Sequence, residues 1–170
     1  MTLRTVHLIA SRNAEAQRAH FAIFVPADGA PEQGTLIEAV GAPMAGYMLE
    51  FKRNYSPSDD SIEKHEIIPI GEIDSANIVD DDSGIKRADA DPRGDIEIVA
   101  SQIPTPGISE NFLAPVNDTT NKRDQEWTME YVRHLVGKRL LGSDAIQIVH
   151  RKRDPPTHGL GFQPSLRRSV

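Results

Sequence analysis

The stretch HFAIFVPADGAPEQGTLIEAV, residues 20–40, decides how this chain folds. It opens with HFAIFV, residues 20–25, a continuous apolar run of strand length that indicates a strand buried on both faces. The dipeptides DG at 28–29 and QG at 33–34 are typical of a hairpin loop. TLIEAV, residues 35–40, then returns as the partner strand, so an antiparallel pair forms the centre of the expected fold.

Three further strands are expected around this hairpin. Residues 3–10 are rich in β-branched and aliphatic side chains, and residues 46–55 alternate between apolar and polar in the manner of a half-exposed strand. Residues 65–73 form another strand, which Pro69 places at an edge of the sheet because proline has no backbone N–H. No helix is expected between these strands, which favours antiparallel pairing.

The clearest helix lies in the second half of the chain. Asn121 is the expected N-cap, and Trp127, Tyr131 and Leu135 recur at i, i+4 and i+8 on one apolar stripe. Gly142 follows as the expected C-terminal stop. This pattern predicts one main helix that packs against the sheet.

The remaining segments are less regular. Residues 74–94 are acidic and read as a solvated loop, although the sequence leaves open a lid over a cleft. Residues 95–103 fit either a helix or a strand, and AIQIVH at 145–150 predicts a closing strand. We therefore expect an α+β fold in one domain over residues 1–153: an antiparallel sheet or partial barrel of about five to six strands with one main helix. Residues 154–170 form an irregular C-terminal tail.

Composition excludes several classes of function. The formal charge of −6 argues against a nucleic-acid binder, and no stretch approaches the roughly 18 apolar residues that a membrane span needs. The N-terminus lacks the pattern of a signal peptide. The chain has no cysteine, which removes disulfides, thiolate metal sites and cysteine nucleophiles together. We expect a cytoplasmic protein that contacts neither nucleic acid nor membrane.

No cofactor or metal is expected either. His65, His134, His150 and His158 lack the spacing of metal ligands, and the chain has no phosphate-binding loop or dinucleotide fingerprint. The expected partner is a small-molecule substrate, and the sequence leaves a homodimer open.

Three segments in a fixed order carry a resemblance: HFAIFVP at 20–26, GTLIEAVG at 34–41 and RDQEWTMEYV at 123–132. They resemble the patterns HxAxFVP, GTLIHVxG and NCQDW of a family of short fungal proteins. That family is similar to the circularly permuted papain-like fold of the lecithin:retinol acyltransferases and NlpC-type peptidases. In those enzymes a strand histidine comes first, a polar residue on the next strand follows, and a cysteine opens a late helix. The resemblance covers residues 6–149.

The chain departs from this pattern where the chemistry depends on it. Matching Trp127 to the family tryptophan puts Asp124 at the cysteine, and matching GTLI puts Glu38 at the second histidine, so only His20 is kept. A helix N-terminus and a facing histidine activate a thiol as nucleophile. An aspartate there would give an anhydride intermediate, so cysteine-type hydrolysis and acyl transfer are excluded.

Each candidate residue has a structural and a catalytic interpretation. His20 is either a core histidine bonded to a backbone carbonyl or a general acid/base. Asp124 is either a capping carboxylate at the third position of the helix or the partner of His20. Glu38 either faces solvent or turns inward and pairs with a cation such as His20 or Arg123.

Further residues are candidates for contact with a substrate. Gln125, next to Asp124, is a possible orienting donor. Lys52, Arg53 and Tyr55 belong to the strand segment FKRNY, residues 51–55. In the catalytic interpretation they line the same cleft as His20 and Asp124. In the structural interpretation they are solubilising residues of an edge strand.

These patterns predict a cofactor-independent cyclase or isomerase that acts by proton transfer on a small organic molecule, a natural-product intermediate. His20, Glu38 and Asp124 form its acid/base set. The alternative is a catalytically inactive papain-like relative that binds a ligand or a protein partner. In that case side chains fill the cleft, and Glu38 and Asp124 point to solvent.

Overall fold

Six strands form one open antiparallel sheet in the computed structural model, which describes residues 1–59 and 64–160. The order across the sheet is β5-β1-β2-β3-β4-β6. The strands are β1 (Leu3–Arg12), β2 (His20–Ala27), β3 (Ala30–Ala42), β4 (Gly46–Tyr55), β5 (Lys64–Asp74) and β6 (Arg87–Asp89). The expected antiparallel α+β architecture is confirmed. The sheet ends at β5 and β6 and does not close into a barrel, and Pro69 lies in the edge strand β5 as predicted.

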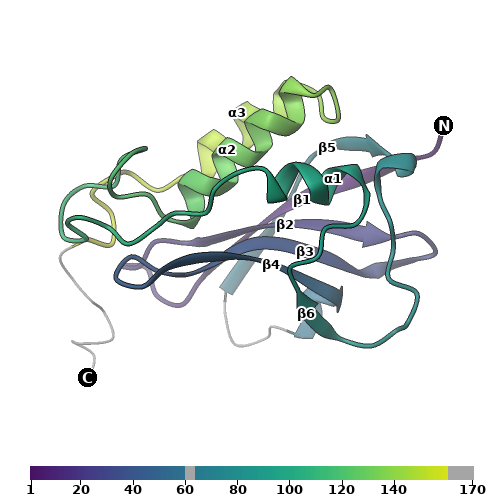
Figure 1. The fold of residues 1–170 in the computed structure, drawn as a ribbon, viewed down its shortest axis with the longest axis horizontal. Helices are drawn as coiled ribbons and strands as arrows, with labels where there is room; N and C mark the ends of the chain where they lie inside the picture. Colours follow the sequence, from purple (N-terminus) through teal and green to yellow (C-terminus); the bar gives the residue numbers. More distant parts are fainter. Residues whose placement is uncertain (60–63, 161–170) are drawn as a thin grey trace.

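Three helices cover one face of this sheet (Figure 1). They are α1 (Gly94–Ser101), α2 (Asp124–Gly137) and α3 (Asp144–Lys152). Helix α2 packs against β2 and β3, and α3 packs against α2 and β5. Over residues 1–59 and 64–160 there are therefore two α-helices beyond the one main helix expected from the sequence.

The strand predicted over residues 145–150 is wrong, because that segment belongs to α3. Its buried residues, Ala145 and Val149, are four positions apart and follow the helical period rather than the strand period. The mixed apolar pattern of AIQIVH fits both periods, and packing against α2 decides between them.

The bounds of α2 also differ from the expectation. The helix begins at Asp124 with Arg123 as N-cap, and the Glu126 carboxylate accepts a hydrogen bond from the Arg123 N–H at 2.9 Å. The expected N-cap, Asn121, instead donates its side-chain amide to the Ala114 carbonyl. At the other end the helix stops at Gly137, before Gly142.

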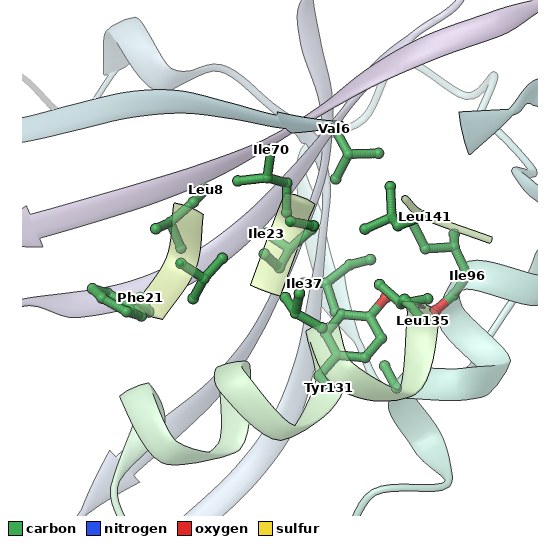
Figure 2. Close-up of a cluster of buried hydrophobic side chains, with 14 of the residues drawn as sticks. Val6, Leu8, Phe21, Ile23, Ile37, Ile70, Ile96, Tyr131, Leu135 and Leu141 are labelled. Carbon is green, nitrogen blue, oxygen red and sulfur yellow. Dashed lines mark hydrogen bonds between the residues drawn. The ribbon is translucent and has the colours of Figure 1, made fainter. Parts of the chain in front are cut away.

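The main hydrophobic core lies between the sheet and the helices (Figure 2). Leu8, Phe21 and Ile23 of the sheet meet Tyr131 and Leu135 of α2 there, all fully buried. A second, smaller cluster on the opposite face consists of Ile9, Ala22, Phe24 and Leu36. Strand β2 is therefore buried on both faces, as its apolar run predicts.

The acidic segment 74–94 is held in place rather than merely solvated. It contains the edge strand β6, which pairs with β4. Asp80 forms an ion pair with Arg4 at 2.8 Å, and Asp81 forms one with Arg87 at 2.6 Å. The hydrogen bond from Arg87 holds the pKa of Asp81 below its usual range, despite the opposing effect of burial.

The predicted tail over residues 154–170 is described only in part. Residues 154–160 lack regular secondary structure, as expected, and include a turn. The rest of that predicted tail, residues 161–170, lies outside the described residues.

Candidate functional site

His20 is the first residue of β2 and stands where the sheet meets the start of α2. Alternate residues of a strand share a face, so His20 lies on the same face of β2 as Ala22 and Phe24, but at the end of the strand, where Asp124 of α2 is within reach. Its side chain is 38% exposed. His20 is therefore open to solvent on one side and is not a core histidine.

Glu38 turns inward from β3 and pairs with His20. Its Oε1 atom lies 2.7 Å from Nε2 of His20, and its Oε2 atom lies 3.2 Å from Nζ of Lys52 on β4. The Glu38 side chain is only 3% exposed, whereas that of Lys52 is 42% exposed. A buried carboxylate thus lies beneath two partly exposed cations, which supply the counter-charge that its burial requires.

Asp124 reaches His20 from the other side. Its Oδ2 atom lies 3.2 Å from Nδ1 of His20 and accepts a hydrogen bond from the backbone N–H of Phe21 at 2.7 Å. Asp124 is the first residue of α2, so the predicted cap at the third helical position is wrong. A carboxylate at a helix N-terminus is also stabilised by the helix dipole.

These contacts fix the protonation state of the imidazole. Burial alone lowers the pKa of His20, but the charge and hydrogen bond of Asp124, together with those of Glu38, outweigh it and raise the pKa to about 10. At neutral pH both ring nitrogens therefore carry protons: Nε2 donates to Glu38, and Nδ1 forms an ion pair with Asp124. The charge of Asp124 also affects Tyr47 of β4: burial first, and then this charge, raise the pKa of the Tyr47 hydroxyl.

Such an arrangement has two chemical abilities. A partly exposed imidazolium can donate a hydrogen bond to an oxygen on which negative charge develops. An adjacent carboxylate can accept a proton from a bound molecule. His20, Glu38 and Asp124, the three residues expected to act together, are brought together.

The three candidate substrate contacts are not part of this group. Gln125 is fully buried, and its amide is bonded to the Ala19 carbonyl and to Asp154, each at 2.8 Å. It therefore joins elements of the fold and offers no free donor to a ligand.

Arg53 and Tyr55 also lie elsewhere. Arg53 has a side chain with 0% exposure and forms ion pairs with Glu97 of α1 at 2.7 Å and Asp89 of β6 at 2.9 Å. It follows Phe51 on the core face of β4, opposite to the face of Lys52, because side chains alternate along a strand. Tyr55 packs edge-on against Phe24 in the second cluster, with ring centroids 6.1 Å apart.

Sequence reasoning missed two relationships at this site. The first is the ion pair between Lys52 and Glu38. Lys52 of β4 lies opposite Leu36 of β3, and Glu38 is the next residue of β3 on the same face, so a correct strand register would have revealed this ion pair. The contacts of Asp154 with Ala19 and Gln125 had no sequence signal, because they join a tail residue to positions far away along the chain.

The molecule has several surface cavities, of which five are lined by residues other than His20, Glu38 and Asp124. One of about 420 Å³ lies on the helix-free face of the sheet, beside His7, Phe24 and Ile67. Over residues 1–59 and 64–160, no group of three or more acidic or histidine side chains could hold a metal ion. No helix in that part of the chain is long and apolar enough to cross a membrane.

Comparison with known proteins identifies a family, but the function of that family is unknown. Neither the curated proteins nor the solved structures include a significant match to this chain. A family model does match; it begins within β1, ends within the loop that follows α2, and includes His20, Glu38 and Asp124. On the strength of that match, over residues 6–142, the chain belongs to the family of unknown function DUF6540.

Proposed function

We propose that this protein is a cofactor-independent enzyme, an isomerase or cyclase that moves a proton on a small organic molecule. One observation carries the proposal. A partly exposed His20 imidazolium is held between Glu38 and Asp124, with nitrogen–oxygen distances of 2.7 and 3.2 Å. Proton-transfer groups that converge at a solvent-accessible point are what acid/base catalysis requires.

The proposed reaction uses Asp124 as the base and His20 as the hydrogen-bond donor. A substrate carbonyl oxygen takes over the Nδ1–H of His20, which releases the Asp124 carboxylate from that contact. Asp124 then removes a proton from the carbon next to the carbonyl, and the electron pair of that C–H bond forms the enolate that His20 stabilises. A carboxylate base opposite hydrogen-bond donors to an enolate oxygen is an established arrangement for such isomerisation.

The proton then returns to the substrate. In an isomerisation, Asp124 delivers it to a different carbon of the enolate system, so the product has the same formula as the substrate. In a cyclisation, the enolate carbon attacks an electrophilic carbon of the same molecule, and the proton goes to the oxygen that becomes negative. Glu38 keeps His20 protonated and oriented throughout, and Lys52 neutralises the outer oxygen of Glu38.

The order of the site residues supports a permuted papain-like framework for this enzyme. A histidine on one strand, a polar residue on the next strand and a helix-opening residue follow one another, and the second and third both contact the histidine. In such a framework Asp124 would take the position of the nucleophile. We further propose a cytoplasmic location, which suits a chain without cysteine. The proposal that the substrate is a natural-product intermediate rests on the resemblance to short fungal proteins and is an analogy.

A second candidate function has a specific observation in its favour. The Asp124 carboxylate is already bonded to Phe21 and paired with His20, and the five cavities described above are lined by residues other than His20, Glu38 and Asp124. This closed arrangement suits a catalytically inactive relative that binds its ligand or protein partner elsewhere. The ion pair would then only join β2 to α2.

Deuterium exchange distinguishes the two functions. The protein is incubated in D₂O with a panel of enolisable ketones and β-dicarbonyl compounds, and loss of the α-proton signals is followed by NMR. The proposal predicts exchange that falls by about a hundredfold or more in Asp124→Asn and in His20→Asn. Asp144→Asn, at the exposed first residue of α3, and His134→Asn, on α2, are the matched controls and keep the wild-type rate.

Two outcomes would reject the enzyme proposal. One is exchange at the same rate in the wild type, Asp124→Asn and His20→Asn. The other is no exchange with any compound of the panel from a protein whose His20 still titrates near pH 10, which favours the inactive relative.

A further inference from the structure

Three residues form a closed ring of hydrogen bonds at the junction of β2, α2 and the C-terminal tail. The Asp154 carboxylate accepts from the backbone N–H of Ala19 and from Nε2 of Gln125, both at 2.8 Å. The same amide nitrogen of Gln125 donates to the Ala19 carbonyl at 2.8 Å, and the Asp154 N–H donates to Oε1 of Gln125 at 2.9 Å. Each residue of the ring is therefore bonded to the other two.

The position of this ring along the chain is informative. Ala19 directly precedes His20, and Gln125 directly follows Asp124. The ring thus holds the immediate neighbours of the two residues whose side chains meet at 3.2 Å. A displacement of Ala19 relative to Gln125 would move the imidazole relative to the carboxylate.

The ring is largely buried, and it contains a charged carboxylate. Gln125 and Ala19 are buried, and the Asp154 side chain is 11% exposed. Burial alone would raise the pKa of Asp154, but the bonds from the Ala19 N–H, Arg12 and Gln125 lower it overall. Arg12, at the end of β1, pairs with the carboxylate at 3.0 Å, so Asp154 stays ionised at neutral pH.

We propose that Asp154 is a positioning residue that sets the contact between His20 and Asp124. The inference rests on the proposed function, in that the pair it positions is the proposed acid/base pair. Asp154 lies beyond residues 6–142, so the matched region alone does not hold every group that shapes this site. A residue of the tail completes it.

The test reads the pKa of His20 directly and needs no substrate. Imidazole signals of ¹⁵N-labelled full-length protein are followed by NMR from pH 6 to 11 for the wild type and Asp154→Ala, and the His20 signals are assigned from their loss in His20→Asn. Asp154→Ala removes the two bonds that the Asp154 carboxylate accepts from Ala19 and Gln125. The Gln125 bond to the Ala19 carbonyl and the Asp124 bond to the Phe21 N–H remain, so we expect Asp124 to shift beside the imidazole of His20 without leaving it. We expect the pKa of His20 to fall from about 10 by about one unit.

A destabilised variant separates positioning from general loss of structure. Tyr131→Phe removes the buried hydrogen bond from the Tyr131 hydroxyl to the Ile96 carbonyl at 2.6 Å, on the other side of α2. We expect this variant to lower the thermal midpoint and to leave the His20 titration unchanged. Asp154→Asn, which keeps the shape of the side chain, is the second test variant if the alanine variant fails to fold, and it also lowers the pKa of His20.

An unchanged His20 pKa in a folded Asp154 variant would overturn the inference. That result is distinct from failure of the proposed function. If His20 and Asp124 prove necessary for proton exchange while Asp154 variants titrate normally, only the positioning role is lost. If no exchange is ever found but the titration shifts, Asp154 still sets the geometry of the ion pair.

Discussion

The Oδ2 atom of Asp124 lies 2.7 Å from the backbone nitrogen of Phe21, so the first residue of α2 is bonded to the second residue of β2, directly after His20. The same oxygen lies 3.2 Å from Nδ1 of His20. One carboxylate therefore performs two tasks, a backbone tether and an ion pair. The two tasks respond differently to substitution, because only the ion pair needs the negative charge.

Asp124→Asn separates the two tasks. An asparagine keeps an oxygen that can accept from the Phe21 N–H, but it has no charge to hold the imidazolium. We expect the pKa of His20 to fall from about 10 by about one to three units, as is usual when an opposite charge at this distance is lost. NMR titration of the imidazole measures this shift. Asp144→Asn, also at the first position of a helix, leaves it unchanged.

A His20 pKa that stays near 10 in Asp124→Asn would show that Glu38 alone sustains the imidazolium. Asp124 would then be only a tether between α2 and β2. Its proposed role as the base would lose its electrostatic basis.

Stability should fall as the pH rises from neutral to alkaline. The pKa of His20 is about 10 in the folded protein and about 6.5 in the unfolded chain, so the folded state binds the proton more tightly. This contribution is fully present below pH 6.5 and is lost as the pH rises to 10. Because solvent screens the exposed ring, we expect a loss of about 1–2 kcal/mol rather than the full linkage value.

Urea unfolding at pH 7 and pH 10 measures this loss. His20→Asn is the comparison, since it removes the titrating group and should show a smaller decrease over the same interval. Equal decreases in the two proteins would mean that other groups, such as the lysines, cause the alkaline loss.

Much of the fold was predictable because it depends on local patterns. The apolar run of β2, the hairpin and the edge position of β5 all follow from residues close together in the sequence. Helix α3 was not, since a segment of nine residues with apolar side chains at both periods takes its form from packing against α2. Local sequence does not contain that contact.

The candidate site was likewise predictable in part. His20, Glu38 and Asp124 were identified through a family resemblance, and their side chains do meet. Arg53 was expected near them, yet it lies on the other face of β4, where Glu97 and Asp89 enclose it. The face of a strand residue depends on the parity of its register, and a single odd step moves a side chain to the opposite side of the sheet.

Glu38→Gln should weaken the ion pairs of His20 and Lys52, because it removes the buried carboxylate that both of them contact. The substitution leaves His20 and Lys52 without the carboxylate that they share at 2.7 and 3.2 Å. We expect a lower His20 pKa and a loss of about 1–2 kcal/mol in the free energy of unfolding, limited because both cations can turn to water. NMR titration and urea unfolding measure the two effects.

The matched control for this variant is Glu50→Gln. Glu50 pairs with Glu38 across β3 and β4 and is less buried. If both variants lower the His20 pKa equally, the effect comes from the general negative charge of this face and not from the Glu38 contact.

Glu97→Gln tests whether Arg53 serves the fold or a substrate. The guanidinium has 0% side-chain exposure, and Glu97 accepts from it at 2.7 Å and from the Arg93 N–H at 2.9 Å. Without that charge Arg53 keeps only Asp89 as a carboxylate partner, so we expect a loss of about 3–5 kcal/mol in the free energy of unfolding. Asp95→Asn, exposed in the first turn of α1, should cost far less.

The His20 titration should be unchanged in Glu97→Gln, because the Arg53 cluster and His20 lie on opposite faces of the sheet. A shifted His20 pKa, or a loss no larger than that of Asp95→Asn, would contradict a structural role and return Arg53 to the candidates for substrate binding.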